Sequence, residues 1–192
     1  ELHAAVGLAQ VNRLDEFFTD LFSKDSATQK KAQQSITNLY YGEKGVPKIA
    51  AAISRLNLSD KEYFDSKSKL IAELGYIKDT TKPVVVNLLK KIFEQTADTN
   101  LFQNQVFKAL ARHKTKAAYQ LFKELILQDP PIFSDNYEYN SLFRNLDDSL
   151  LLAKELFPEL LQLSTLSDYK DNVLSLLVTL VDSNLIKATD YT

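Results

Sequence analysis

The chain has 192 residues, of which 23 are basic and 25 acidic, and 45% of its residues are hydrophobic, as in an ordinary globular domain. With only 4 Gly and 5 Pro, it has too few turn residues for an all-β sandwich or barrel. The absence of Cys excludes disulfides, thiolate nucleophiles and Cys-based metal sites. The net charge of −2 disfavours nucleic acid as a partner, and no apolar run is long enough to predict a membrane span.

Five segments of the chain align without gaps and share one apolar pattern. Their last leucines lie 35, 36, 36 and 34 residues apart, and their first, second and fifth positions are apolar except at Ser35. This is the spacing of a helix face that is turned toward a core. We therefore predict five first helices, called A helices, near residues 26–41, 60–75, 98–112, 136–147 and 167–182.

A second helical pattern follows each of the first four A helices and predicts the B helices. Pro47 and Pro83 lie near the first turn of two of them, where a missing N–H costs nothing. Ser26 and a capping box of Ser59 with Glu62 mark the starts of two A helices. Residues 2–22 fit the B helix of a preceding repeat, or a cap.

These patterns predict an all-α fold, a right-handed α-solenoid of about five antiparallel helix pairs. We expect one repeat domain over residues 1–192. Because the chain lacks Met and the fifth pair lacks a complete B helix, we also expect it to be a piece of a longer protein.

The clearest repeat combines a Leu-Gly-x-Ile-x-Asp turn at residues 74–79 with Pro83 and Leu88-Leu89. It resembles a HEAT repeat of the short kind found in phycocyanobilin-lyase-like proteins. The fourth and fifth repeats lack the Gly and the Pro, so only their periodicity supports them. Tetratricopeptide repeats have nearly the same period, but their Trp, Gly-Tyr and Ala-Phe pattern is not visible, and HEAT-like repeats are favoured.

Few residues suggest catalysis. We predict that His113 is a solvated turn residue and that Asp147 and Asp148 lie at the boundary between two helices. Glu155 and Glu159 are predicted to form a solvated stripe on one helix face. No paired histidines and no Gly-rich loop are present. We therefore predict no catalytic residue, no metal site and no cofactor.

The resemblance to HEAT repeats implies that the B helices line a concave face. Non-core residues there form a polar and basic set that could meet an acidic partner: Lys48, Arg55, Asn87, Lys91, Gln120 and Lys123. The connection over residues 128–140 adds three aromatic residues that could anchor a partner: Phe133, Tyr137 and Tyr139.

The leading hypothesis is a non-catalytic scaffold that binds a protein or peptide. An alternative is an accessory helical domain of a larger enzyme whose catalytic domain lies outside this chain. A third is an enzyme in its own right, since the resemblance to lyase-type HEAT proteins implies that a bilin could be handled; DNA-repair HEAT-like glycosylases rank with it. The sequence indicates neither the compartment nor the oligomeric state.

Overall fold

The structure is a computed structural model that describes residues 14–35, 46–77, 83–97, 101–128, 146, 150–166 and 169–190. Every regular element in these ranges is a helix, so the all-α prediction is confirmed for this part of the chain. The chain divides into two compact units, residues 1–109 and 110–192. This division does not test the predicted single repeat domain, which stays a prediction.

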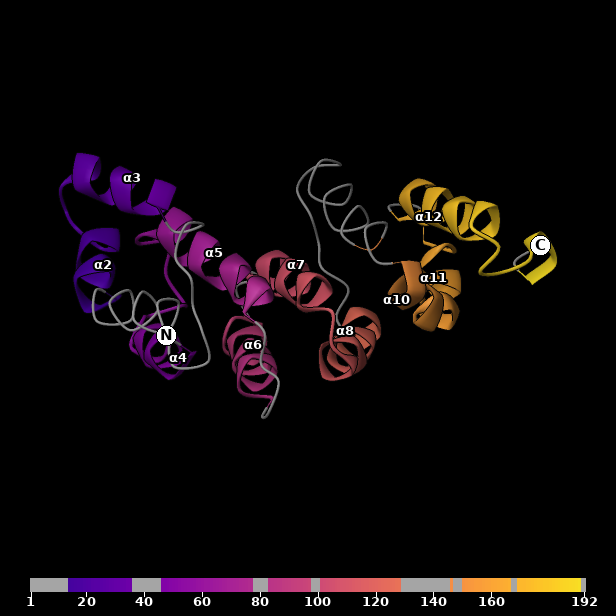
Figure 1. Ribbon diagram of the computed structural model, residues 1–192, viewed down its shortest axis with the longest axis horizontal. Helices are drawn as coiled ribbons and strands as arrows, with labels where there is room; N and C mark the ends of the chain where they lie inside the picture. The colour runs from indigo at the N-terminus through magenta and orange to yellow at the C-terminus, as the bar shows by residue number, and fades with distance from the viewer. Residues whose placement is uncertain are drawn as a thin grey trace, which may run out of the picture. The chain divides into compact units, whose positions relative to one another are not determined.

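Among the described residues of the first unit, two groups of helices make close backbone contacts. α2 (Leu14–Leu21) contacts α3 (Ser26–Ser35), and α3 contacts α5 (Phe64–Glu73). α4 (Val46–Ser54) contacts α6 (Val84–Gln95). Figure 1 shows α3 and α5 following one another along one side of the unit, with α4 and α6 along the other. The 3-10 helix η2 (Leu74–Tyr76) extends α5, and α7 (Gln103–His113) crosses the division between the units.

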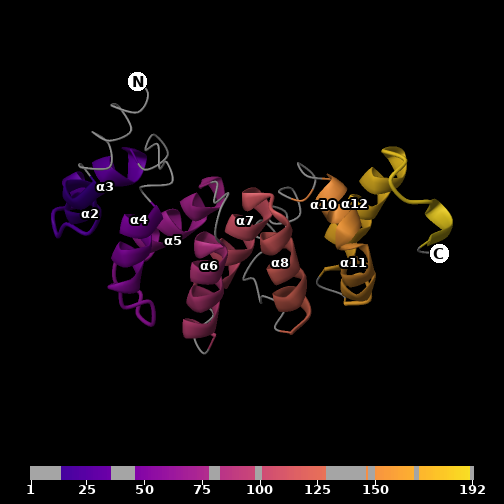
Figure 2. The ribbon, with the colours of Figure 1, turned by 60° about the horizontal axis from the view of Figure 1, so that its bottom comes forward.

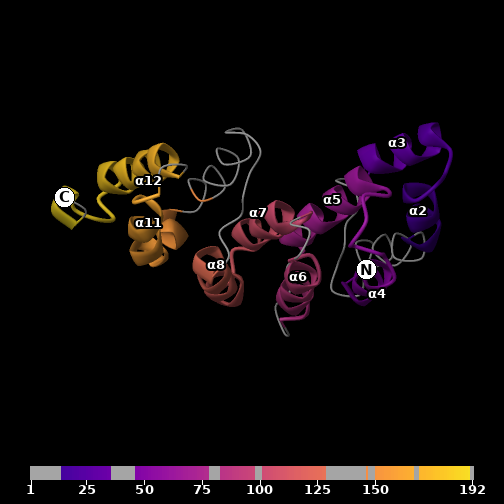
Figure 3. The same ribbon diagram turned by 180° about the vertical axis from the view of Figure 1, so that it is seen from behind.

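In the described residues of the second unit, four α-helices follow the end of α7. These are α8 (Lys116–Gln128), α10 (Leu150–Glu155), α11 (Phe157–Leu163) and α12 (Lys170–Asp182), followed by the 3-10 helix η3 (Ala188–Asp190). α11 packs against α8 and α12, and α10 against α11 and α12. The grouping of α10, α11 and α12 is visible in Figure 2, and Figure 3 shows α11 beside α12 from behind.

Three buried phenylalanines, Phe93, Phe102 and Phe107, lie in the mainly aliphatic core of the first unit. The ring of Phe102 is fully buried and stacks on Phe64, with 5.2 Å between the ring centroids. Phe107 meets Phe93 edge-on, at 5.7 Å and 87°. Burying such a side chain contributes roughly 1.5–3 kcal/mol, so these rings join α5, α6 and α7 strongly.

A buried hydroxyl group ties three helices of the first unit together. Ser66 on α5 is fully buried, and its Oγ donates a hydrogen bond of 2.9 Å to the carbonyl of Leu21 on α2. The same Oγ accepts a hydrogen bond of 2.8 Å from Nε2 of Gln33 on α3. Because both bonds cross between helices, Ser66 determines how α5 sits against α2 and α3.

Two predicted helix starts differ from the structure. Asp25, not Ser26, caps α3, since its Oδ2 accepts hydrogen bonds from the N–H and the hydroxyl of Thr28. The capping box of Ser59 with Glu62 is wrong, because α5 begins at Phe64 after Tyr63, which has φ 54° and makes no side-chain cap.

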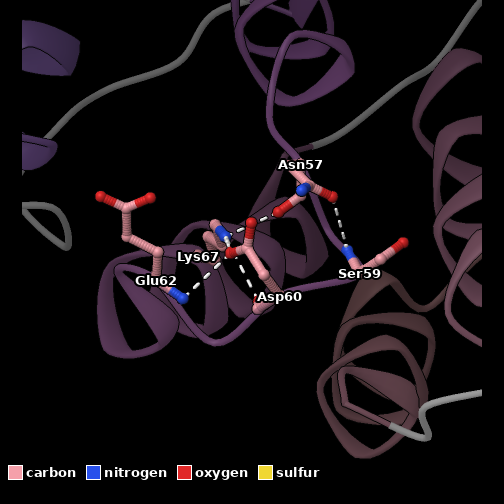
Figure 4. A network of polar contacts seen from close by, with 5 residues as sticks. All are labelled: Asn57, Ser59, Asp60, Glu62 and Lys67. Carbon is pink, nitrogen blue, oxygen red and sulfur yellow. Dashed lines mark hydrogen bonds and ion pairs between the residues drawn. The ribbon is translucent and has the colours of Figure 1, made fainter.

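A buried lysine explains the later start of α5. The Nζ of Lys67 donates to the carbonyl of Asn57 at 2.6 Å and to Oδ1 of Asp60 at 2.8 Å. Oδ1 of Asp60 also accepts the N–H of Glu62 at 2.9 Å, and the Asn57 side chain accepts the N–H of Ser59. Figure 4 shows how the α4–α5 connection folds around the ammonium group. Asp60 therefore organises the turn before α5. The N–H of Ser59 belongs to a different turn, in which it is bonded to the Asn57 side chain.

Proline breaks the predicted fourth B helix in two. The apolar pattern of Leu152, Leu156 and Leu160 predicts one helix, but α10 ends at Glu155 and α11 begins at Phe157. Pro158 lies in the first turn of α11. It lacks the N–H that would bond to the carbonyl of Lys154, and its ring would clash with that carbonyl in a continuous helix.

Candidate functional site

A half-open pocket of about 270 Å³ lies beside α8 in the second unit. Four of its lining residues come from one face of α8, at the helical spacing i, i+3, i+4 and i+7, and two come from the end of α10 and the break that follows it. The lining residues are Lys116, Tyr119, Gln120, Lys123, Glu155 and Leu156. The pocket is therefore mainly polar, with a buried leucine on its α10 side.

An ion pair links a lining residue of the pocket to α11. The Nζ of Lys123 lies 3.1 Å from Oε1 of Glu159 on α11. The Glu159 side chain is only 8% exposed, whereas that of Lys123 is 41% exposed. The prediction of a solvated stripe is therefore wrong for Glu159, although Glu155 is exposed. Glu159 is buried because its side chain points toward α8. The residue pattern of α11 alone does not reveal this contact.

Positive charge is concentrated at the start of this site. From residue 110 to residue 123 the chain carries no Asp or Glu but four basic residues, in a protein whose net charge is −2. Three of them occur in five residues around the α7–α8 connection: Arg112, Lys114 and Lys116. Lys114 has φ 55°, so the connection turns through the left-handed region at this residue.

The structure brings two of the predicted partner-binding residues together. Gln120 and Lys123 both line the pocket. Asn87 and Lys91 are exposed one turn apart on α6, and Arg55 is exposed directly after α4, all three in the first unit. The backbone of Lys48 lies in α4, but its side chain is outside the described residues, as are Phe133, Tyr137 and Tyr139.

Sequence reasoning missed four residues of the pocket. Lys116 and Tyr119 lie at i−4 and i−1 from Gln120, so helical spacing alone could have added them to the set. Glu155 and Leu156 line the pocket from the end of α10 and the break after it. No local pattern signals that placement.

His113 is buried, so the prediction of a solvated turn residue is wrong. It ends α7 with 6% of its surface exposed. Its Nδ1 shares a hydrogen bond of 3.0 Å with the hydroxyl of Thr115. The same hydroxyl oxygen accepts the N–H of Ala118 at 3.3 Å, in the first turn of α8. His113 thus supports the α7–α8 connection.

The described residues contain no group of three or more His, Asp or Glu side chains placed to hold a metal ion. Asp147 and Asp148 lie outside these residues. In the part of the chain that the structure describes, no helix is long and apolar enough to cross a membrane. The chemistry that the pocket offers is charge pairing and hydrogen bonding by Lys, Gln and Glu around a small apolar surface.

Comparison with known proteins gives no relative. No protein-family model, no curated protein and no solved structure matches the chain.

Proposed function

We propose that this chain is a non-catalytic scaffold that binds a protein or peptide through the exposed side chains of its B helices. The observation that carries the proposal is the pocket beside α8, where four side chains of one helix face and two from the neighbouring pair surround a space of about 270 Å³. Small-molecule sites are typically clefts of about 300–1,000 Å³. A half-open pocket of this size suits one side chain of a larger partner.

Helix packing supports the HEAT-like solenoid that we propose for this scaffold. The predicted A helices α3 and α5 contact each other, and so do the predicted B helices α4 and α6, and α8 and α11. In a solenoid, equivalent helices of successive repeats pack side by side in this way.

Two polar contacts support the same stacking. Gln33 and Ser66 are hydrogen-bonded and lie 33 residues apart, and the ion pair of Lys123 with Glu159 joins residues separated by 36 positions. Both separations are close to one repeat period. Contacts at this separation are expected where a position in one repeat meets its equivalent in the next.

Stacked helices make a binding face that needs little ordering. Because backbone hydrogen bonds and core packing hold the α8 side chains in place, association costs less conformational entropy than it would for a loop. The affinity of such a face comes from a few well-placed side chains.

The test is a selection of twelve-residue peptides from a random library on the immobilised protein, followed by calorimetry of the binders. Gln120→Trp fills the pocket whatever the charge of the ligand, so we expect it to lower affinity at least about tenfold. Gln34→Trp, at an exposed position of α3, is the matched control and should leave affinity unchanged. Failure to select any peptide, or binders that are indifferent to Gln120→Trp, would overturn the proposal.

A further inference from the structure

We infer that the partner segment is acidic, that its carboxylates pair with Lys116 and Lys123 on α8, and that Glu159 acts as the positioning residue for Lys123. This inference rests on the proposed function and names the chemistry of the partner. It concerns only the second unit, which contains all of these residues.

The charge distribution favours a carboxylate ligand at this face. Two lysines, Lys116 and Lys123, line the pocket, against one acidic lining residue, Glu155. Lys116 is exposed at the first position of α8, and Lys123 follows two turns later on the same face. Seven residues of helix advance about 10 Å, so a segment with two carboxylates about 10 Å apart can pair with both ammonium groups.

The ion pair with Glu159 restrains the Lys123 side chain before a ligand binds. An ammonium group has three N–H donors, and Glu159 Oε1 engages it at 3.1 Å while 41% of the lysine side chain stays exposed. A free lysine side chain loses rotamer entropy when it is immobilised. Because a buried carboxylate already restrains Lys123, less of that entropy is lost when a ligand binds.

Other lining groups select an acidic peptide over a polyanion such as nucleic acid. Glu155 is exposed at the pocket, and its carboxylate would repel a continuous run of phosphates. The half-buried ring of Tyr119 offers apolar contact to the methylene groups of an aspartate or glutamate side chain. An acidic segment that carries one basic or polar residue toward Glu155 would complement the whole site.

The first experiment uses the peptides selected from the random library. We expect them to be enriched in Asp and Glu, and we expect Lys116→Glu to weaken their binding about tenfold. The variant should fold, because glutamate in the first turn of a helix is favourable. Lys170→Glu, the same change at the first residue of α12, is the matched control and should have no effect. Replacing one glutamate of the peptide by lysine should restore binding to the Lys116→Glu protein.

The second experiment tests Glu159 through a double-mutant cycle with Lys123. Glu159→Gln and Lys123→Gln should each lower affinity for the acidic peptide several-fold, and the double variant should lose no more than Lys123→Gln alone. A merely structural role would make the two losses add. Thermal unfolding of each variant confirms that binding is compared between folded proteins.

The outcomes separate this inference from the proposed function. The inference would be overturned if the peptides bind more weakly to the Gln120→Trp protein but lack acidic residues. It would also be overturned if their binding is unaffected by Lys116→Glu. In both cases the scaffold proposal would stand. Additive losses in the cycle would overturn the positioning role of Glu159. If no peptide binds, both proposals fail.

Discussion

The ammonium group of Lys123 on α8 lies 3.1 Å from Oε1 of Glu159 on α11, 36 residues further along the chain. One partner is buried and the other is partly exposed. The pair therefore joins two neighbouring helices beneath a polar surface. Because Lys123 also lines the pocket, this contact affects both stability and the proposed binding.

Removing the ammonium group of Lys123 should destabilise the protein. Lys123→Met keeps the length of the side chain but leaves the buried Glu159 carboxylate without its ion pair. We expect the free energy of unfolding to fall by about 1–3 kcal/mol, measured by urea denaturation at pH 7. Lys170→Met, at an exposed position of α12, should change it by less than about 0.5 kcal/mol. Equal stability of the two variants would contradict the assigned role of the pair.

Ser66→Ala should destabilise the first unit. The change removes the donor to the Leu21 carbonyl and the acceptor for Gln33 Nε2 at a fully buried position. We expect a loss of about 1–3 kcal/mol in the free energy of unfolding. Ser175→Ala on the exposed face of α12 is the control and should be neutral or slightly stabilising, since alanine favours helix. A neutral Ser66→Ala would show that the three helices do not depend on this hydroxyl.

The stability of the α4–α5 connection should depend on pH through Asp60. The hydrogen bond from Lys67 holds the pKa of the Asp60 carboxyl below its ordinary value of 3.8. A carboxylate whose folded-state pKa is lowered stabilises the fold above its unfolded pKa, and this contribution is lost as the pH falls through the folded pKa. The stability difference between wild type and Asp60→Asn should therefore shrink progressively below about pH 4, as followed by urea denaturation from pH 7 downwards.

Lys67→Met provides the matched background for that measurement. Without the ammonium group, the main cause of the lowered pKa of Asp60 is absent, and Asp60→Asn should change the pH profile much less. A pH-dependent difference of the same size in both backgrounds would contradict the assignment to Lys67.

Asp25 rather than Ser26 should control the start of α3. Asp25→Ala removes the acceptor of both Thr28 hydrogen bonds, whereas Ser26→Ala removes a hydroxyl from the first residue of the helix. We expect Asp25→Ala to lower the melting temperature more than Ser26→Ala does. Because the Thr28 hydroxyl lowers the pKa of Asp25, this difference should also diminish at acidic pH. The reverse order of the two variants would restore Ser26 as the cap.

Much of the helical pattern was accessible to sequence reasoning, because a helix displays its buried face every three or four residues. That spacing puts Ile49, Leu70 and Leu89 on apolar faces, and the structure buries all three. Pro47 lies in the first turn of α4 and Pro83 directly before α6, as predicted. The helix boundaries were harder to predict. The helix breaks at Leu156 because of Pro158, and the spacing of the leucines gives no sign of this break.

The sequence by itself determined the all-helical class and which face of each described helix is apolar, since both depend on neighbours within one or two turns. Only the tertiary structure decided which polar side chains are buried. Lys67, Ser66 and Glu159 carry no local mark of burial, yet each is buried against a partner on another segment. Such a residue is stable inside only when a complementary group meets it there, and that group is supplied by residues up to 45 positions away in the chain.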